Sequence, residues 1–432
     1  LERFGTEFKY NANNQIESIT DIDGNQLTFS YNGDKLQQVQ DSYLRTLIFN
    51  YTGESLTNVS DSTGRSVNFE YNDGNGNLTD YLDPEGKRWK YSYNMDHQMI
   101  STINPLNIVQ VANTYDSLNR VYSQTFPRQS GDRTYNFFYT GFRNIEEDPY
   151  GKQVIYHFDR MGRTVGMEDH LGNTKISKFD GQNQIIESID KRGNLSKTFF
   201  DENLNVDYFV DALDKTTDNS YDVQLRLTDV TDPLNHTIHF EYDGENHLIL
   251  TRDGEDNEFE TTYYPDGEVQ TEIDGRDNVV TYTYDSKGNI DATQATGHPV
   301  VDYTYDDIGR LTSLTDQEGA VTAFQYDDRG LLEKLTDPLL KEKNYTYDDV
   351  GRLKTVTDRN NNVTIYEYTD SGKVLSKTFQ DASATTYTYN DRDFIKSVSN
   401  VNGTITYMYD DLYRVISEND TLGINIGYEY NE

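Results

Sequence analysis

Acidic residues gather in short turns that offer the oxygen ligands preferred by Ca²⁺. The richest run is Asp253 to Glu258, and a second is Asp73 to Asn77. An EF-hand calcium loop also needs glycine at its sixth position and glutamate at its twelfth. The first run has neither, and the second, followed by Leu78, fails in the same way. We therefore interpret these carboxylates as solvated turn residues that cap their own backbone, and we predict no metal site.

The histidines give no stronger signal for catalysis or metal binding. His236 and His239 form an H-x-x-H pair, but residues three apart on a strand point to opposite faces, so joint ligation is not expected. The other five histidines are scattered, and the sequence contains no G-x-S-x-G, H-E-x-x-H or G-x-x-x-x-G-K-[S/T] motif. We predict a non-enzymatic protein with no catalytic, cofactor-binding or metal-binding residues and no cofactor.

Aromatic side chains are the other group with binding potential. The chain has 35 Tyr and 19 Phe, and many of the tyrosines precede Asp or Asn. Exposed rows of such residues bind glycans through ring stacking and hydrogen bonds, whereas buried rows pack the strands of a sheet. Both interpretations are open from the sequence.

These aromatic residues recur with a period that runs through the whole chain. One returns about every 21 residues, usually followed by Asp or Asn. The anchors are Tyr10, Tyr31, Tyr51, Tyr71, Tyr93, Tyr115, Tyr139, Phe158, Phe179, Phe200, Tyr221, Tyr242, Tyr264, Tyr284, Tyr305, Tyr326, Tyr347, Tyr368, Tyr389, Tyr409 and Tyr430. Such a period indicates tandem copies of one supersecondary unit, about 20 in number.

Two turn signals divide each repeat, with consensus Y-D-x-x-G-R-L-x-x-V-T-D-x-x-G-x-x-T-x-Y-x, into two short strands. The first turn has Asp or Asn after the aromatic and Gly or Asn at its fourth position, as in Asp306 to Gly309. The second has the form D-x-x-[G/N/D], as in Asp316 to Gly319. Both favour a tight turn whose fourth residue is left-handed. The repeat is therefore predicted to be a β-hairpin.

The side-chain spacing predicts how the two strands face each other. Aromatics two apart, such as Tyr303 and Tyr305, share one face of a strand. In the other strand the aliphatics stand three apart, as in Leu311 and Leu314. A β-bulge or a strong local twist in this second strand returns both aliphatics to the same face.

Composition limits both the architecture and the partners. Only 34% of residues are hydrophobic, which suits a thin sheet wetted on both faces better than a solid core. The formal charge of −36 argues against nucleic acid and anionic membranes as partners, and no apolar run approaches the roughly 20 residues of a membrane helix. The absence of cysteine excludes disulfides and thiolate sites.

Twenty hairpins give about 40 strands, more than an open sheet holds without curling. We predict an all-β fold in which one long antiparallel sheet spirals into a hollow shell. A compact β-solenoid with a narrow filled core is the alternative. The repeat continues across residues 1–432, so we expect one continuous domain, cut from a longer protein at both ends.

With Y-D, G-R-L and T-D-x-x-G established, the chain resembles the RHS or YD-repeat family, most closely from Tyr284 to Asp358. That family includes bacterial RHS toxins, the C components of insecticidal toxin complexes, wall-associated proteins and teneurins. The resemblance implies β-hairpins that spiral into a hollow shell, which in the toxins encloses a C-terminal effector. Family toxins also carry a self-cleaving core segment after the repeats. No such segment follows Tyr409 here, so we do not expect self-cleavage.

The function expected from this resemblance is structural. We expect a secreted or cell-surface bacterial shell that encloses and protects a C-terminal toxin, absent from this chain, for competition between cells. The alternative is an extracellular adhesion module that binds glycans or cell-wall polysaccharide. Either protein is expected to be a monomer and to lie outside the cell or in the cell wall.

Overall fold

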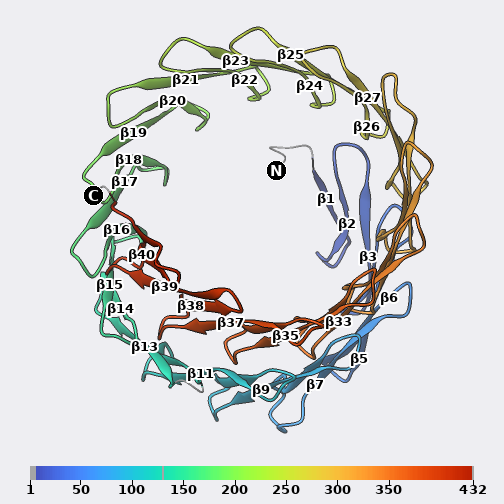
Figure 1. Ribbon diagram of the computed structural model, residues 1–432. Helices are drawn as coiled ribbons and strands as arrows, with labels where there is room; N and C mark the ends of the chain where they lie inside the picture. Colours follow the sequence, from blue (N-terminus) through green and yellow to red (C-terminus); the bar gives the residue numbers. More distant parts are fainter. Residues whose placement is uncertain (1–5, 129–130, 431–432) are drawn as a thin grey trace. The chain divides into compact units, whose positions relative to one another are not determined.

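The computed structural model describes residues 6–128 and 131–430. Within these residues the chain is all-β and contains no helix, so no helix long and apolar enough to cross a membrane is found there. Its 41 strands follow one another along the chain as hairpins of one antiparallel sheet (Figure 1). This confirms the predicted fold class.

The first half of the sheet contains strands of three to seven residues. They are β1 (Glu7–Tyr10), β2 (Ile16–Thr20), β3 (Gln26–Asn32), β4 (Lys35–Gln40), β5 (Thr46–Thr52), β6 (Ser55–Asp61), β7 (Ser66–Glu70), β8 (Asp80–Leu82), β9 (Arg88–Tyr93), β10 (Met99–Ile103), β11 (Val109–Tyr115), β12 (Val121–Phe126), β13 (Arg133–Tyr139), β14 (Arg143–Glu147), β15 (Gln153–Phe158), β16 (Thr164–Glu168), β17 (Thr174–Phe179), β18 (Ile185–Ile189), β19 (Leu195–Phe200) and β20 (Val206–Val210).

The second half continues in the same way, mostly with strands of five or six residues. They are β21 (Thr216–Tyr221), β22 (Leu227–Thr231), β23 (Thr237–Tyr242), β24 (Leu248–Arg252), β25 (Glu258–Tyr263), β26 (Val269–Ile273), β27 (Val279–Tyr284), β28 (Ile290–Ala295), β29 (Val301–Tyr305), β30 (Leu311–Thr315), β31 (Val321–Tyr326), β32 (Leu332–Thr336), β33 (Glu342–Tyr347), β34 (Leu353–Thr357), β35 (Val363–Tyr368), β36 (Val374–Thr378), β37 (Ala384–Tyr389), β38 (Ile395–Asn400), β39 (Gly403–Tyr409), β40 (Val415–Asp420) and β41 (Asn425–Gly427).

A β-bulge recurs where most aromatic anchors meet the next strand, although the β13–β14 pair, with Tyr139 opposite Asn144, has none. In β29 and β30, Thr304 pairs with Ser313 but Tyr305 pairs with Leu311, which leaves Thr312 as the extra residue. Leu314 pairs with Tyr303, so both aliphatics of β30 lie opposite aromatics. The predicted bulge in the aliphatic strand is confirmed.

The turns also adopt the predicted conformation. Gly309 and Gly319 have φ of 85° and 78°, and in several repeats a bulky residue such as Leu204 (φ 66°) or Tyr413 (φ 68°) holds the same left-handed position. A side chain there carries a steric cost that glycine does not have.

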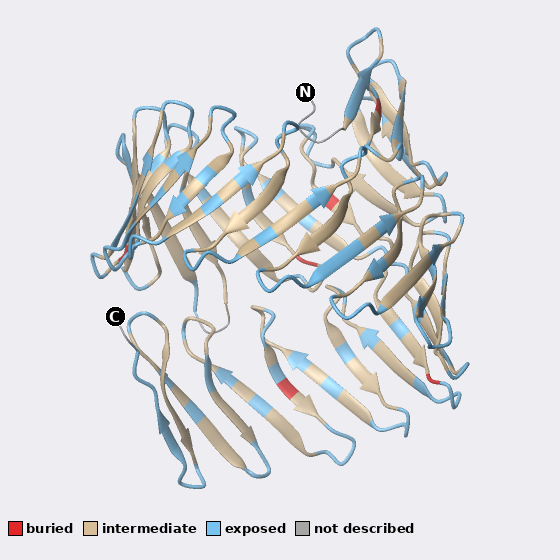
Figure 2. Ribbon diagram, turned by 90° about the horizontal axis from the view of Figure 1, so that it is seen from above, coloured by how far each residue is buried: buried red, intermediate tan, exposed pale blue. Residues whose placement is uncertain are grey.

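The sheet has no hydrophobic core in the ordinary sense. No hydrophobic side chain among the described residues is buried, and the few buried residues are polar, such as Ser18, Asp80 and Asp337. Figure 2 shows intermediate and exposed residues along nearly every strand. A compact solenoid needs a row of buried apolar side chains, so this burial pattern contradicts that alternative.

The chain divides into two compact units, each built from segments far apart in the sequence. Unit 1 comprises Leu1–Phe49, Asp61–Thr63 and Asn136–Ala320, and unit 2 comprises Asn50–Ser60, Gly64–Tyr135 and Val321–Glu432. In both units an N-terminal segment contacts a segment more than 200 residues later. That the repeats form a single continuous domain stays a prediction.

Candidate functional site

The aromatic anchors have a structural contact that repeats along the chain. In at least ten of the repeats that the structure describes, the tyrosine hydroxyl donates a hydrogen bond to a backbone carbonyl 14 to 16 residues earlier, at 2.6–3.0 Å. These tyrosines are Tyr71, Tyr115, Tyr221, Tyr242, Tyr263, Tyr347, Tyr368, Tyr389, Tyr409 and Tyr430. A hydroxyl whose proton is donated to the backbone has lost its donor for a sugar, which favours packing over glycan binding at these anchors.

The residue after the anchor stabilises the turn. Asp306 accepts backbone hydrogen bonds from Ile308 and Arg310 through one carboxylate oxygen, and the Arg310 side chain pairs with the other at 2.6 Å. The same Asp–Arg pair, four residues apart, recurs after the anchors at Asp116–Arg120, Asp159–Arg163, Asp222–Arg226, Asp348–Arg352 and Asp410–Arg414, and in the second turn of one repeat at Asp41–Arg45. In these turns the carboxylate is satisfied within its own repeat.

The arginine of this pair also reaches the next repeat. The Arg226 guanidinium lies 4.8 Å from the centre of the Tyr242 ring and donates to the Asp243 carbonyl at 2.9 Å. Arg352 stacks in the same way on Tyr368 at 4.5 Å. The Y-D-x-x-G-R consensus therefore connects neighbouring hairpins by cation–π and hydrogen-bond contacts.

The acidic runs singled out in the sequence follow this turn geometry. The Asp253 carboxylate accepts hydrogen bonds from the backbone of Glu255 and from the backbone and side chain of Asn257. The Asp73 carboxylate does the same with Asn75 and Asn77. In both cases these hydrogen bonds lower the pKa of the carboxyl group, led by Asn257 at Asp253 and by Asn75 at Asp73. The carboxylates are placed as turn caps.

The H-x-x-H pair forms two separate contacts. His236 lies 3.1 Å from Asp232 of its own turn, and His239 lies 2.7 Å from Asp229 on the paired strand β22. The hydrogen bond from His239 to Asp229, followed by its interaction with Glu241, raises the pKa of His239 despite partial burial. The two imidazole rings therefore contact different carboxylates.

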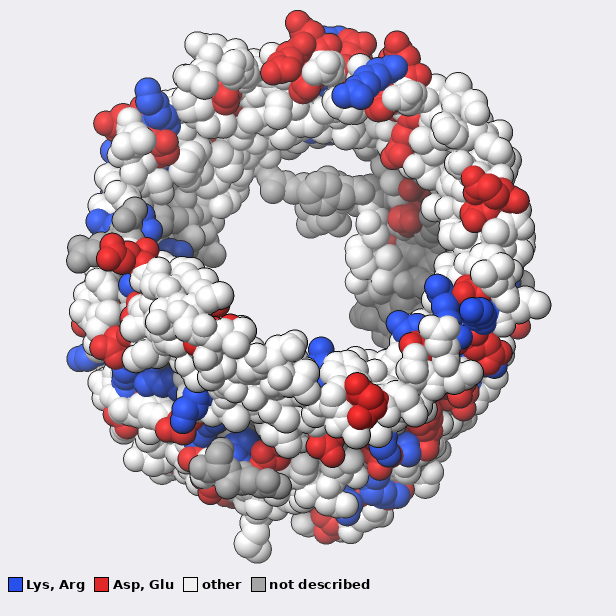
Figure 3. All heavy atoms as spheres, in the orientation of Figure 1, with Lys and Arg blue, Asp and Glu red and all other residues white. Residues whose placement is uncertain are grey.

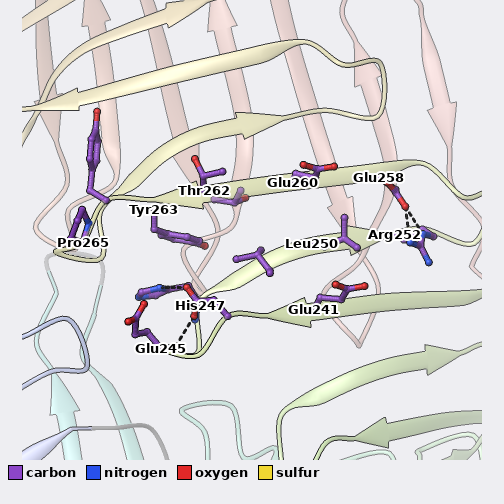
Figure 4. Close-up of a pocket in the computed structure, with 14 residues that line it drawn as sticks. Glu241, Glu245, His247, Leu250, Arg252, Glu258, Glu260, Thr262, Tyr263 and Pro265 are labelled. Carbon is purple, nitrogen blue, oxygen red and sulfur yellow. Dashed lines mark hydrogen bonds and ion pairs between the residues drawn. The ribbon is translucent and has the colours of Figure 1, made fainter.

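One polar groove stands out in unit 1, at the turns of β23 to β26. Its volume is about 810 Å³, and Figure 4 shows His247 and Tyr263 at one end and the Arg252–Glu258 ion pair at the other. The lining residues are mostly acidic or aromatic: Glu241, Asp243, Glu245, His247, Ile249, Leu250, Arg252, Glu258, Glu260, Thr261, Thr262, Tyr263, Tyr264 and Pro265.

The residue with the most polar contacts at this end of the groove is His247, which the sequence analysis did not single out. Its Nδ1 lies 2.8 Å from Asp243 of its own turn, and its Nε2 lies 2.7 Å from Asp23 in the turn between β2 and β3. The ring also stacks on Tyr263 with centroids 4.5 Å apart. A signal was available, because His247 occupies the position that is arginine in six other repeats.

The same group is the nearest approach to a metal site among the described residues. Asp243, Glu245 and His247 offer ligand atoms within 4.8 Å of one another. Both ring nitrogens of His247, however, already contact carboxylates. A histidine ligand must present a bare nitrogen, so this geometry describes an ion-paired imidazole rather than a metal ligand.

The geometry at β25 corrects one anchor. Tyr264 begins the turn: its backbone carbonyl accepts a hydrogen bond from the Gly267 N–H at 3.0 Å, as the carbonyls of the turn aspartates do in other repeats. The Tyr263 hydroxyl donates a hydrogen bond to the Leu248 carbonyl. The anchor of this repeat is Tyr263, and Tyr264 stands in the aspartate position. The predicted anchor at Tyr264 was wrong because two adjacent tyrosines make the repeat phase ambiguous.

Charge is distributed as neighbouring opposite pairs. On the face shown in Figure 3, acidic and basic side chains lie beside one another, in keeping with the repeated Asp–Arg contacts. The excess of negative charge is therefore spread over many turns.

This repeat geometry matches one family. The Teneurin YD-shell family model matches residues 3–111 and 251–402, more than half of the chain, and the RHS Repeat model matches residues 221–258. The chain belongs to the YD-shell family. The resemblance drawn from the Y-D and G-R-L motifs is thereby confirmed, and the YD shell is a structural repeat fold.

Solved toxin structures share the fold of this YD-shell chain. A crystal structure of TcdB2-TccC3 superimposes with a TM-score of 0.66 at 13% identity, over 96% of this chain and 30% of that one. TcdB2-TccC3 without its hypervariable C-terminal region gives 0.66 at 16% identity, over 91% and 24%. A Photorhabdus luminescens Tc holotoxin pore gives 0.60 at 15% identity, over 96% and 24%.

The chain thus spans between about a quarter and a third of the length of these structures. No curated protein matches it.

Proposed function

We propose that this chain is part of a non-enzymatic shell that encloses and protects a C-terminal toxic effector of a secreted or cell-surface bacterial protein. The observation that carries the proposal is the absence of buried hydrophobic side chains among the described residues. A sheet without a core of its own leaves both of its faces accessible. A shell wall needs two accessible faces, because one faces solvent and the other faces the cargo. An enzyme or a filled solenoid would need a packed interior.

Family membership and structural likeness support the same role. The chain belongs to the YD-shell family, and its structural neighbours are parts of Tc toxins. Since it spans less than a third of those chains, we expect the effector to lie outside these 432 residues. Intercellular competition is the use we propose for such an enclosed toxin.

The negative charge of the chain favours an effector of opposite charge. A chain with a formal charge of −36 attracts basic protein segments and repels acidic ones, most strongly at low ionic strength. We therefore expect the enclosed effector to be basic. Retention of basic and acidic fragments by the immobilised chain at 20 mM and 500 mM salt tests this. Equal retention of both fragments at low salt would remove the electrostatic part of the proposal.

Protease protection tests the enclosure itself. The full-length protein that contains these repeats is digested with a nonspecific protease, natively and after partial unfolding in urea, and effector fragments are followed by mass spectrometry. We expect the effector to survive natively and to be cut once the repeats open. The isolated effector is the control. Digestion of the native protein's effector at the same rate as the isolated one would refute enclosure.

A further inference from the structure

We propose that His247, held between Asp23 and Asp243, is a protonation-dependent contact that joins the β2–β3 turn to the β23–β24 turn of unit 1. We call these three residues the His247 cluster. The two turns are 224 residues apart in sequence. The proposal concerns the chain itself and stands whether or not the shell encloses an effector.

His247 occupies the arginine position of its repeat. Arg226, one repeat earlier, pairs with Asp222 four residues before it and stacks on the anchor Tyr242 sixteen residues after it. His247 keeps both contacts, with Asp243 four residues before it and Tyr263 sixteen after it. The structure of the repeat is therefore preserved while a permanent cation is replaced by a group that titrates near neutral pH.

The contacts of the His247 ring indicate its charge. Ionised carboxylates accept hydrogen bonds and donate none, and a neutral imidazole has only one N–H. His247 contacts a carboxylate through each nitrogen, at 2.7 Å to Asp23 and 2.8 Å to Asp243. Both contacts are hydrogen bonds at the same time only when the ring is a doubly protonated imidazolium. The geometry thus describes the charged form.

The surroundings favour that charge. On its own turn His247 faces Asp243 and Glu245, and Asp23 faces it from the β2–β3 turn. From β25 it meets Tyr263. The other charged groups of the groove are Glu241, Arg252, Glu258 and Glu260. Glu272 lies near Tyr263, and Arg226 donates to the Asp243 carbonyl. Arg226 and Arg252 are themselves paired with Asp222 and Glu258, so the net local charge is negative.

The fit is close at one further point. Gly267, in the turn between β25 and β26, has φ of 85°, and a Cβ there would overlap the Asp23 carboxylate. The side chain of His247 is only 13% exposed and that of Asp23 is 23% exposed. Asp23 therefore reaches His247 across the backbone of Gly267, and the contact is sheltered from solvent.

The direction of the pH dependence follows from these contacts. The hydrogen bond to Asp23, opposed by partial burial and reinforced by Asp243, raises the pKa of His247 above its ordinary value of 6.5. A raised folded-state pKa gives stabilisation that is complete below the unfolded value and is lost as pH rises through the folded one. Above that value a neutral ring satisfies one carboxylate and turns a lone pair toward the other. The two turns then separate.

The charge assignment is tested by nuclear magnetic resonance of the seven histidine rings, with His247→Gln used to assign its resonance. We expect His247 to titrate above its ordinary value of 6.5. Asp23→Asn, which keeps the shape of the side chain, should lower the His247 midpoint. A His247 midpoint at or below 6.5, or no response to Asp23→Asn, would overturn the proposal.

The opening is tested by hydrogen exchange of residues 16–32, corrected for intrinsic rates at each pH. Protection in the wild type should be higher at pH 6 than at pH 9, because the stabilisation by the protonated ring is lost as pH rises through the raised pKa of His247. His247→Gln should give low protection at both values. His236→Gln is the matched control and should behave as the wild type. A wild-type profile that is flat, or that His247→Gln reproduces, contradicts the proposal.

Discussion

The two compact units hold their sequence-distant segments together with different cations. In unit 1 the β2–β3 turn meets the β23–β24 turn through Asp23 and His247. In unit 2 the corresponding long-range contacts use Arg133 with Asp393, at 2.7 Å, and other Arg and Lys pairs. Arginine keeps its charge at every pH a protein tolerates, whereas histidine does not. The same structural task is therefore insensitive to pH in one unit and sensitive to it in the other.

The two contacts satisfy their carboxylates with different donor geometry. Arg133 and Asp393 are 15% and 23% exposed and form a two-point contact, with the second hydrogen bond at 3.0 Å. His247 has only two ring nitrogens, but each faces a carboxylate. A planar guanidinium satisfies one carboxylate with two donors, and an imidazolium joins two carboxylates with one donor each.

The largest effect is expected from Arg133→Ala. The change leaves Asp393 partly buried without its cation and should destabilise the local structure by about 2 kcal/mol, below the roughly 3–5 kcal/mol of a fully buried pair because both side chains retain some exposure. Hydrogen exchange of residues 384–395 measures it, as an increase of about thirtyfold.

This effect should be the same at pH 6 and pH 9, in contrast to that of His247→Gln. Lys396→Ala, an exposed residue of β38, is the control and should change exchange little. If Arg133→Ala reduces hydrogen-exchange protection at pH 6 but not at pH 9, the Arg133 contact is also pH-dependent. The proposed difference between the two units would then be wrong.

The second prediction converts one type of contact into the other. His247→Arg restores the arginine found at this position in six repeats. We expect the β2–β3 turn to keep its pH 6 protection at pH 9, where the wild type loses it. Hydrogen exchange of residues 16–32 is again the measurement.

His236→Arg provides the matched control, since His236 holds the equivalent position in its own turn and its ion pair is with Asp232 of that same turn. It should leave the exchange of residues 16–32 unchanged. If His247→Arg retains the wild-type loss of protection at pH 9, titration of residue 247 is not its cause.

The sequence predicted what is local to the repeat. The period, the hairpin, the bulge at Leu311 and the turn caps follow from side-chain spacing and turn chemistry within about 21 residues, and the structure confirms them. The predicted anchor at Tyr264 failed at the one place where two tyrosines are adjacent. Local physics thus specifies the unit and, with one exception, its phase.

The candidate site lay beyond this local information. His247 meets Asp23 across 224 residues, and Arg133 meets Asp393 across 260. Such pairs depend on how the twist of many successive strands accumulates, which no single repeat specifies. A departure from the consensus, histidine in place of arginine after Asp243, was the one sequence signal that marked the site.

The smallest effect is expected at Lys87, which pairs with Asp349 in unit 2 at 2.7 Å. The side chains are 32% and 49% exposed, so the pair is solvated and Lys87→Met should cost about 0.5 kcal/mol at low salt. In 1 M salt the screening length falls to about 3 Å and the difference should vanish. The measurement is hydrogen exchange of residues 83–87 and 348–352 at both salt concentrations. Lys396→Met serves as the control, and a cost at Lys87 that persists unchanged in 1 M salt would place this contact with the sheltered Arg133 pair instead of with the solvated ones.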